Sequence, residues 1–384
     1  MVKIGGSLIT DKSTAATLLQ ERLDQVAGGI LSLWRALGPG NLVLVHGAGS
    51  FGHHEAKLYG LRRGGVVGGS PSATAVGATL TRAAVRDLNG HVCRALAAAG
   101  LPAVAISPAD AGAETTAHGS SLTPAGESAL SKAVARSLSL GFLPVLHGDV
   151  VIDTSSAATS APQPLSVLSG DVIVSALART LASSAAVTMS DVPGLLTAPP
   201  GEPGSALVRA VVLASAPAAR PGTATLVAAV VSETRLPGGT TGLVVRHGAE
   251  IGDPGAGGSM RLGGVDGGAG DKDFASAAAA PDVTGGMHGK VFELCGLVLS
   301  LGEGSACLVG MAGGGAALAA ALAPGCSDAS AAGTGEESEA LRGVLCGLGV
   351  GTNAAARAAG FPGTAVVLGL RVREPFGVAA SADG

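Results

Sequence analysis

The sequence has few aromatic and few charged residues. Of its 384 residues, 2% are aromatic and 14% are charged, while 47% are hydrophobic, and this hydrophobic excess comes mainly from alanine. A chain of this length can bury one large core or two modest ones. No uninterrupted apolar run reaches the roughly 18 to 20 residues that a membrane-spanning helix needs, so we expect no membrane partner.

Positive charge and cysteine are also limited. The chain has 24 Lys and Arg against 28 Asp and Glu, a net charge of −4, which gives no basic surface for a nucleic-acid partner. The five cysteines are odd in number and lack metal-type spacing, which indicates a reduced compartment and no metal site built from them. No leader precedes the first expected strand, so we expect a cytoplasmic protein or an incomplete N-terminus.

A Walker phosphate-binding loop is absent, but a different glycine loop follows a short apolar strand at residues 41–45. This loop runs from His46 to His54 and leads into a helix-compatible segment. Glycines let backbone N–H groups approach an anion, and a following helix N-terminus adds partial positive charge. The loop therefore predicts a phosphate site, with His53 and His54 at its rim.

Two other interpretations of this loop are open. Gly47, Gly49 and Gly52 also fit the G-x-G-x-x-G dinucleotide fingerprint, which requires an acidic residue about 20 positions further on. Residues 66–70 contain no carboxylate, which argues against a dinucleotide site. The loop could also be a purely structural tight turn.

A second glycine loop opens the chain. Residues 2–4 form a short apolar strand, and Gly5, Gly6 and Ser7 turn immediately after it. Lys3 and Lys12 flank this turn, a combination that suits a triphosphate.

Acids and glycines recur where further strands are expected to end. A buried strand at 144–151 contains Gly148 and Asp149, a helix at 170–181 begins beside Asp171, and a strand at 187–190 leads to Asp191. Asp171 also suits a helix N-cap. Open α/β sheets bind ligands in the crevice at such strand ends, so these residues are expected to lie near one site.

In this order, the segments resemble the amino acid kinase superfamily, and within it the isopentenyl phosphate kinases. Lys-x-Gly-Gly-Ser at 3–7 and Thr-Gly-Gly-Met-x-x-Lys at 284–290 are typical of the superfamily, and the resemblance covers residues 2 to about 195 and 282 to about 352. The continuation Ile-Thr-Asp-Lys, the loop Gly-x-Gly-Ser-Phe-Gly-His and Gly-Asp-Val-Val are similar to the isopentenyl phosphate kinases. The resemblance implies ATP-dependent phosphorylation of isopentenyl phosphate to isopentenyl diphosphate, a step of isoprenoid biosynthesis in the mevalonate pathway, with Mg²⁺ as cofactor.

The resemblance also implies roles for individual residues. The catalytic residues would be Lys3, Lys12, His53 and Asp171. The acceptor phosphate would be bound by Gly47, Ala48, Gly49, Ser50, Gly52, His53, Gly148 and Asp149. ATP would be bound by Lys3, Gly5, Gly6, Ser7, Asp191, Gly194, Gly285, Gly286, Met287 and Lys290. An acceptor phosphate is already an anionic nucleophile, so no general base is required.

The expected fold class is α/β, a three-layer αβα sandwich with a mainly parallel central sheet, as in amino acid kinases. Helices are expected at 17–37, 73–99 and 127–140, and a strand at 102–106. We expect an acceptor-binding half at 1–183, an ATP-binding half at 184–352 and a C-terminal tail at 353–384.

A low-complexity insertion is expected at about 198–281. This stretch is rich in Gly, Pro and Ala, with short strand candidates at 225–231 and 242–245 and an otherwise disordered composition, which 325–339 shares. Pro193 also replaces an acidic residue that many members of the resembled family carry.

Several alternatives stay open. The chain could be another small-molecule kinase of the superfamily, acting on an amino acid or a nucleoside monophosphate, or a catalytically silent sensor. A sensor would be expected to lose Lys3, Lys12 or Lys290, and all three are present. A small-molecule substrate and a homodimer are the expected partners. Val76, Leu80 and Ile106 are candidate tail-pocket residues, whereas His46, His91 and His147 suit structural roles or roles in supporting the residues that bind ligand.

Overall fold

The computed structural model describes residues 1–61, 71–155, 165–183, 185–192, 194, 205–215, 226–235, 241–251, 260–262, 306–311 and 364–368. Within these ranges the strands form an 11-stranded sheet and a 4-stranded sheet. The order in the larger sheet is β13-β12-β11-β10-β15-β14-β9-β1-β2-β6-β3.

The N-terminal part of the large sheet is parallel. Its strands are β1 (Val2–Ile4), β2 (Leu44–His46), β3 (Ala103–Ile106), β6 (Leu143–His147) and β9 (Ala185–Ser190). β1 pairs in parallel with both β2 and β9, and β6 pairs in parallel with both β2 and β3. The carboxyl ends of these strands therefore meet at one edge, as the strand-end residues predicted.

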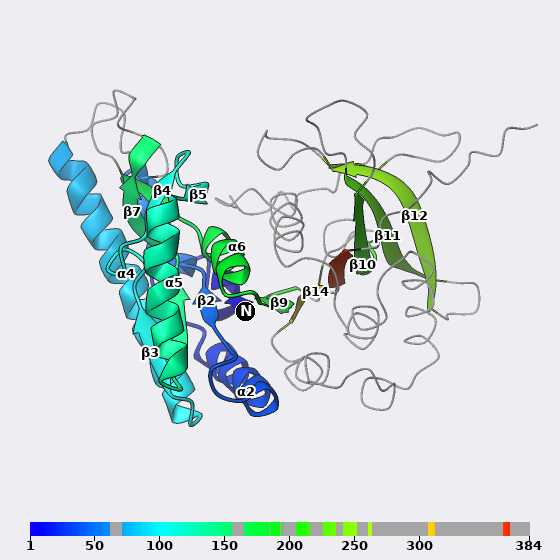
Figure 1. The fold of residues 1–384 in the computed structure, drawn as a ribbon, viewed down its shortest axis with the longest axis horizontal. Coiled ribbons are helices and arrows are strands. Elements are labelled where there is room, and N and C mark those ends of the chain that lie inside the picture. Colours follow the sequence, from blue (N-terminus) through cyan, green and yellow to red (C-terminus); the bar gives the residue numbers. More distant parts are fainter. Residues whose placement is uncertain are drawn as a thin grey trace, which may run out of the picture.

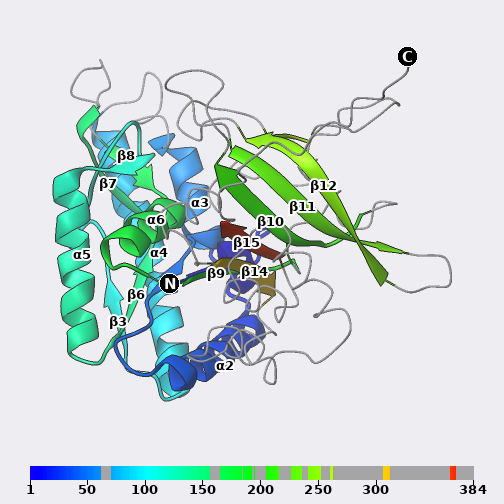
Figure 2. The ribbon, with the colours of Figure 1, turned by 45° about the vertical axis from the view of Figure 1, so that its right-hand side comes forward.

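Helices cover both faces of this parallel part (Figures 1 and 2). α2 (Gln20–Leu37) and α4 (Pro71–Ala98) pack on one face, and α5 (Pro124–Ser139) and α6 (Gly170–Thr180) pack on the other. Successive strand residues alternate between the two cores: Leu44 packs with α2 and α4, whereas Val45 packs with α5 and α6. The expected three-layer αβα arrangement with a mainly parallel sheet is confirmed here.

The helix after the first loop begins at Gln20, three residues later than expected. Residues before it pair with the first loop instead: Leu19 N donates to Ile9 O at 2.9 Å, and Thr10 and Leu18 form an isolated β-bridge. The helix expected at 127 begins earlier, at Pro124, because the Thr123 hydroxyl accepts a hydrogen bond from Gly126 N and caps it.

The single strand expected at 144–151 is two strands in different sheets, so that prediction is wrong. β6 ends at His147, the chain turns at Gly148, and β7 (Asp149–Asp153) joins the small sheet. That sheet has the order β5-β4-β7-β8, with β4 at Glu114–Thr116, β5 at Ser121–Leu122 and β8 at Leu165–Leu168.

The stretch expected to be a low-complexity insertion contains long strands. β10 (Val208–Ser215), β11 (Leu226–Arg235), β12 (Thr241–Ile251) and β13 (Met260–Leu262) form consecutive antiparallel pairs. They extend well beyond the short candidates at 225–231 and 242–245. Each of β10, β11 and β12 is rich in Val, a residue that favours strands.

Two strands join this antiparallel part to β9. β14 (Ala306–Met311) pairs in parallel with β9, and β15 (Thr364–Leu368) pairs with both β14 and β10. Residues 364–368, which were expected in the C-terminal tail, are therefore part of the central sheet.

Candidate active site

The two glycine loops touch each other. The first loop connects β1 to α1 (Gly6–Ile9), and the second connects β2 to α3 (Gly49–Leu58). A Cβ added at Gly6 would lie 2.4 Å from Gly49 N, and one added at Gly47 would lie 2.9 Å from Gly6 N. The backbones can approach this closely only because these positions lack side chains. Two helix starts, whose first N–H groups have no intrahelical acceptor, thus lie side by side.

Thr10 ties the two loops together. Its hydroxyl donates to Gly6 O at 2.8 Å and accepts from Ser50 N at 3.0 Å. Gly49 has a φ of +53°, and a Cβ there would lie 2.2 Å from Thr10 Oγ1. Ser50, a predicted phosphate ligand, also accepts a hydrogen bond from Thr17 N at 3.2 Å. In the sequence, Thr10 was noted only as part of the Ile-Thr-Asp-Lys motif. Its hydrogen bonds to both loops become visible only in the folded structure.

The two predicted lysines are each paired with a predicted aspartate. Lys3 Nζ donates to Asp171 Oδ1, and these side chains are only 14% and 21% exposed. Lys12 Nζ lies 3.9 Å from Asp191 Oδ2 in a more open position. The structure thus brings Lys3, Lys12, Asp171 and Asp191 together with the first glycine loop. Asp171 pairs with Lys3, whereas Asp191 is the carboxylate near Lys12.

Asp171 lies in the first turn of α6 rather than at its N-cap. Ser169 is the N-cap, and its hydroxyl accepts a hydrogen bond from Val172 N at 3.3 Å. The N-cap interpretation of Asp171 is therefore wrong. Its carboxylate is free to pair with Lys3, and the positive end of the helix dipole also favours its negative charge.

The predicted residues on α3 fall on different sides of the helix. His53 and His54 are both exposed, whereas Gly52 is buried against α4. A Cβ at Gly52 would lie 2.5 Å from Val85 Cγ1, so close helix packing accounts for glycine there.

Gly148 lies at the corner between β6 and β7. Its N–H donates to His46 O at 3.3 Å, and an added Cβ would lie 3.2 Å from Leu168 O. The next residue, Asp149, is buried. Its carboxylate accepts from Arg82 Nε at 3.2 Å, from the Ser107 hydroxyl at 2.8 Å and from Ala109 N at 3.3 Å. Asp149 therefore fastens the Gly148 corner to α4 and to the loop after β3.

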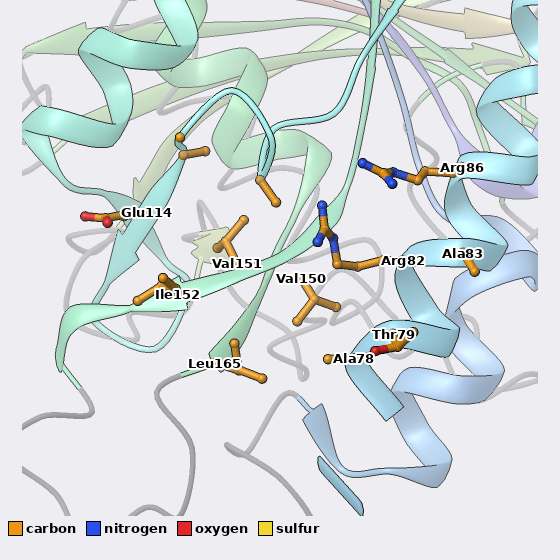
Figure 3. Close-up of a pocket in the computed structure, with 13 residues that line it drawn as sticks. Ala78, Thr79, Arg82, Ala83, Arg86, Glu114, Val150, Val151, Ile152 and Leu165 are labelled. Atoms are coloured by element: carbon orange, nitrogen blue, oxygen red, sulfur yellow. The ribbon is translucent and has the colours of Figure 1, made fainter. Parts of the chain in front are cut away.

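A pocket of about 480 Å³ lies beside this network, between α4 and β7 (Figure 3). Arg82 and Arg86 reach from α4 towards it, and both pair with Asp110. The opposite wall is apolar and is formed by Val150, Val151, Ile152 and Leu165. The three tail-pocket candidates are not among its lining residues: Val76 and Leu80 are exposed, and Ile106 packs against the α5–α6 core.

Two buried histidines lie behind the glycine loops. Burial, together with the nearby His147, lowers the pKa of His46 to about 3. Burial also lowers the pKa of His147, an effect that the charge of Asp149 opposes. Both rings are therefore neutral near pH 7.

The depressed pKa of His46 predicts a loss of stability in mild acid. Below pH 6.5 the unfolded chain takes up a proton that folded His46 cannot accept, so the free energy of unfolding should fall by about 1.4 kcal/mol per pH unit. The fall should continue towards pH 3, the folded pKa. Urea midpoints at pH 7, 6 and 5 should decline less steeply for His46→Phe than for the wild type. The urea midpoint of His54→Gln, which lacks an exposed histidine, should decline with pH as that of the wild type does. Equal slopes in all three proteins would show that His46 does not cause the pH dependence.

Some predicted residues cannot be placed. The residues outside the described part of the chain are Gly285, Gly286, Met287 and Lys290. Gly194, by contrast, is described and buried.

Within the described ranges, no group of three His, Cys, Asp or Glu residues is arranged to hold a metal ion. None of the described helices combines the length and apolar character needed to cross a bilayer.

Residues 1–236 match the sequence profile of the Amino acid kinase family. The chain is 37% identical over 169 residues to the isopentenyl phosphate kinase of Arabidopsis thaliana, covering 44% of this chain and 46% of that protein. It thus spans about half the length of this relative. It is 33% identical over 203 residues to the isopentenyl phosphate kinase of Methanothermobacter thermautotrophicus, covering 52% of this chain and 70% of that protein.

A solved structure with the description "X-ray structures of isopentenyl phosphate kinase" is 31% identical in sequence to this chain, with a TM-score of 0.46. The structural match covers 54% of this chain and 78% of the solved chain. The family profile covers more than half of the chain, and the Methanothermobacter thermautotrophicus relative is matched over more than two thirds of its length. The chain therefore belongs to the amino acid kinase family, among the isopentenyl phosphate kinases.

Proposed function

We propose that the protein transfers the γ-phosphoryl group of ATP to isopentenyl phosphate and forms isopentenyl diphosphate and ADP. The observation that carries this proposal is the Lys3–Asp171 pair beside two touching glycine loops. Such a site offers fixed cations and backbone N–H groups to several phosphate oxygens at once. The isopentenyl phosphate kinases that the chain resembles supply the identity of the acceptor.

The reaction needs charge neutralisation and alignment rather than a base. An oxygen of the acceptor phosphate attacks the γ-phosphorus, and the bond from that phosphorus to the bridging oxygen of ADP breaks. Negative charge spreads over the transferring group during this step. Lys3 and Lys12 neutralise that charge, Asp171 and Asp191 hold the lysines, and the second glycine loop with His53 holds the acceptor phosphate.

Mg²⁺ is proposed to enter with the nucleotide. This ion usually keeps several waters and binds through substrate phosphates and one or two carboxylates, so a cage of protein ligands is not required. Asp191, whose side chain is 38% exposed and lies near Lys12, would help to hold it. When bound, the ion neutralises charge on the β- and γ-phosphates.

The pocket between α4 and β7 is proposed to take the hydrocarbon part of the acceptor. It begins one residue beyond the Gly148–Asp149 corner, and Val150, Ile152 and Leu165 offer an apolar wall. Its arginines are neutralised by Asp149 and Asp110, so they do not require a charged ligand.

The resemblance also supports proposals about the setting of the protein. These are a homodimer formed through the N-terminal half, a cytoplasmic location and a role in isoprenoid precursor synthesis through the mevalonate pathway.

A panel of acceptors tests the proposed function. Purified protein with Mg²⁺ and ATP should release ADP with isopentenyl phosphate far faster than with acetylglutamate, carbamate or UMP. Preferential turnover of any of the last three would show that the acceptor assignment is wrong.

His53 and His54 provide a matched pair of variants on one helix. If His53 holds the acceptor phosphate, His53→Ala should lower kcat/KM by roughly 10² or more, mainly through a higher KM for the acceptor. His54→Ala should change kcat/KM far less. Steady-state kinetics with varied isopentenyl phosphate measure both, and equal effects would refute the choice of His53.

A further inference from the structure

The two buried histidines hold the glycines that follow them. His46 ends β2 and His147 ends β6, and the two residues are paired in register on adjacent strands. Their ring centroids lie 5.8 Å apart. The Nδ1 atom of His46 lies 3.0 Å from Gly47 O, and that of His147 lies 2.9 Å from Gly148 O.

These distances fix the position of the ring protons. A carbonyl oxygen only accepts, so each Nδ1 must carry a hydrogen and donate it. The Nε2 atom of His46 lies 3.0 Å from Asn89 Nδ2, which only donates, so this Nε2 must accept. His46 is therefore neutral, with its proton on Nδ1.

Asn89 anchors His46 to helix α4. It is 2% exposed, and its amide also donates to Val145 O at 3.3 Å. The Asn89 amide oxygen accepts from Cys93 Sγ at 3.7 Å. A continuous series of buried and partly buried hydrogen bonds thus runs from α4 through His46 to the second glycine loop.

Holding the Gly47 carbonyl also sets the direction of the next N–H group. In a trans peptide the C=O of one residue and the N–H of the next point in opposite directions. Gly47 O is drawn back towards His46, so Ala48 N–H points away from that ring. Ala48 is the N-cap residue of α3. Without an anchor, a glycine peptide can rotate more freely than that of any other residue.

We propose that His46, held by Asn89, is a positioning residue that directs the Ala48 N–H towards the acceptor phosphate. His147 holds the Gly148 carbonyl at the β6–β7 corner in the same way. This inference rests on the proposed function, because it deepens the assignment of the second glycine loop to the acceptor.

Variants of His46 separate positioning from simple structural support. His46→Phe keeps an aromatic ring but removes the Nδ1 donor, and we expect KM for isopentenyl phosphate to rise about tenfold or more while KM for ATP changes less than about twofold. His46→Asn places an amide donor near the former Nδ1 position and should return the acceptor KM to within about threefold of the wild type. His91→Phe, a histidine change on α4, should leave both KM values unchanged. Equal changes in both KM values, or no rescue by Asn, would overturn the proposal.

The ring protons can be observed directly. Long-range ¹H–¹⁵N spectra of the full chain with ¹⁵N-labelled histidine should show two neutral rings protonated at Nδ1 near pH 7, one lost in His46→Phe and the other in His147→Phe. A ring at position 46 that is protonated at Nε2, or charged, would overturn the proposal even if His46→Phe fails to fold.

Failure of the proposed function can be distinguished from failure of the positioning role of His46. If the wild-type protein does not phosphorylate isopentenyl phosphate, the proposed function fails, and binding of inorganic phosphate to the wild type and to His46→Asn and His46→Phe is compared by calorimetry. Tenfold weaker binding in His46→Phe alone would support the positioning role, and equal binding in all three would overturn it.

Discussion

Replacing Lys3 by methionine is expected to lower kcat by about 10³, which corresponds to about 4 kcal/mol. Lys3 is only 14% exposed, so its charge is weakly screened by solvent. The interaction should strengthen as charge develops on the transferring phosphoryl group, so kcat should fall more than substrate affinity. Steady-state kinetics at saturating ATP and isopentenyl phosphate measure the effect.

Two further variants identify the origin of that loss. Lys3→Met leaves Asp171 without its partner, so the double variant with Asp171→Asn removes the unpaired carboxylate as well. If charge neutralisation is the role of Lys3, the double variant should stay as slow as the single one. Lys12→Met should lower kcat by about 10²–10³. The effect should be nearer the lower figure, because Lys12 is 58% exposed and its charge is more strongly screened by solvent. Near-normal kcat in Lys3→Met would remove Lys3 from the catalytic residues.

Gly6→Ala is expected to lower kcat/KM by about 10² or more, because the added methyl group must push the two glycine loops apart. Its Cβ would lie 2.4 Å from Gly49 N and 2.7 Å from Gly49 Cα, and backbone atoms cannot rotate away as a side chain can. Overpacking of this kind typically costs 1–3 kcal/mol of stability, so Tm should fall as well.

Gly28→Ala provides the matched control. Gly28 lies in α2, and an added Cβ there meets no described atom within 4 Å. Alanine favours a helix over glycine by about 1 kcal/mol, so this variant should be fully active and slightly more stable. If Gly6→Ala behaved like Gly28→Ala in thermal melts and kinetics, the close contact of the loops would have no functional importance.

Local patterns in the sequence predicted much of the N-terminal half. The strand at Val2–Ile4 and the helix that begins at the second glycine loop depend on residues close in sequence. Lys3 and Asp171 were both expected at the site from the family resemblance, whereas their pairing is a contact between residues 168 positions apart. What local patterns could not predict is the change of sheet at Gly148. His147, Gly148 and Asp149 interrupt the apolar run, but they do not show which sheet the next strand joins.

Other features required tertiary contacts that leave little local trace. Arg82 lies in α4, and only the fold brings it to Asp149, 67 positions away in the sequence. Thr10 joins the two loops across 40 residues. Outside the strand candidates at 225–231 and 242–245, the stretch at about 198–281 was expected to be disordered because it is rich in Gly, Pro and Ala. Instead β10 pairs with β15, and β11, β12 and β13 follow it in the same sheet. Composition measures how much apolar area a segment can bury, but not whether a neighbouring strand is available.

Transfer of the γ-phosphoryl group of ATP to another phosphate can be observed by phosphorus NMR of a mixture of purified protein, Mg²⁺, ATP and isopentenyl phosphate. The spectrum distinguishes a new diphosphate from free inorganic phosphate. We expect loss of the isopentenyl phosphate signal and growth of two coupled diphosphate signals in step with ADP. ADP that accumulates with inorganic phosphate alone, while isopentenyl phosphate stays unchanged, would contradict this expectation.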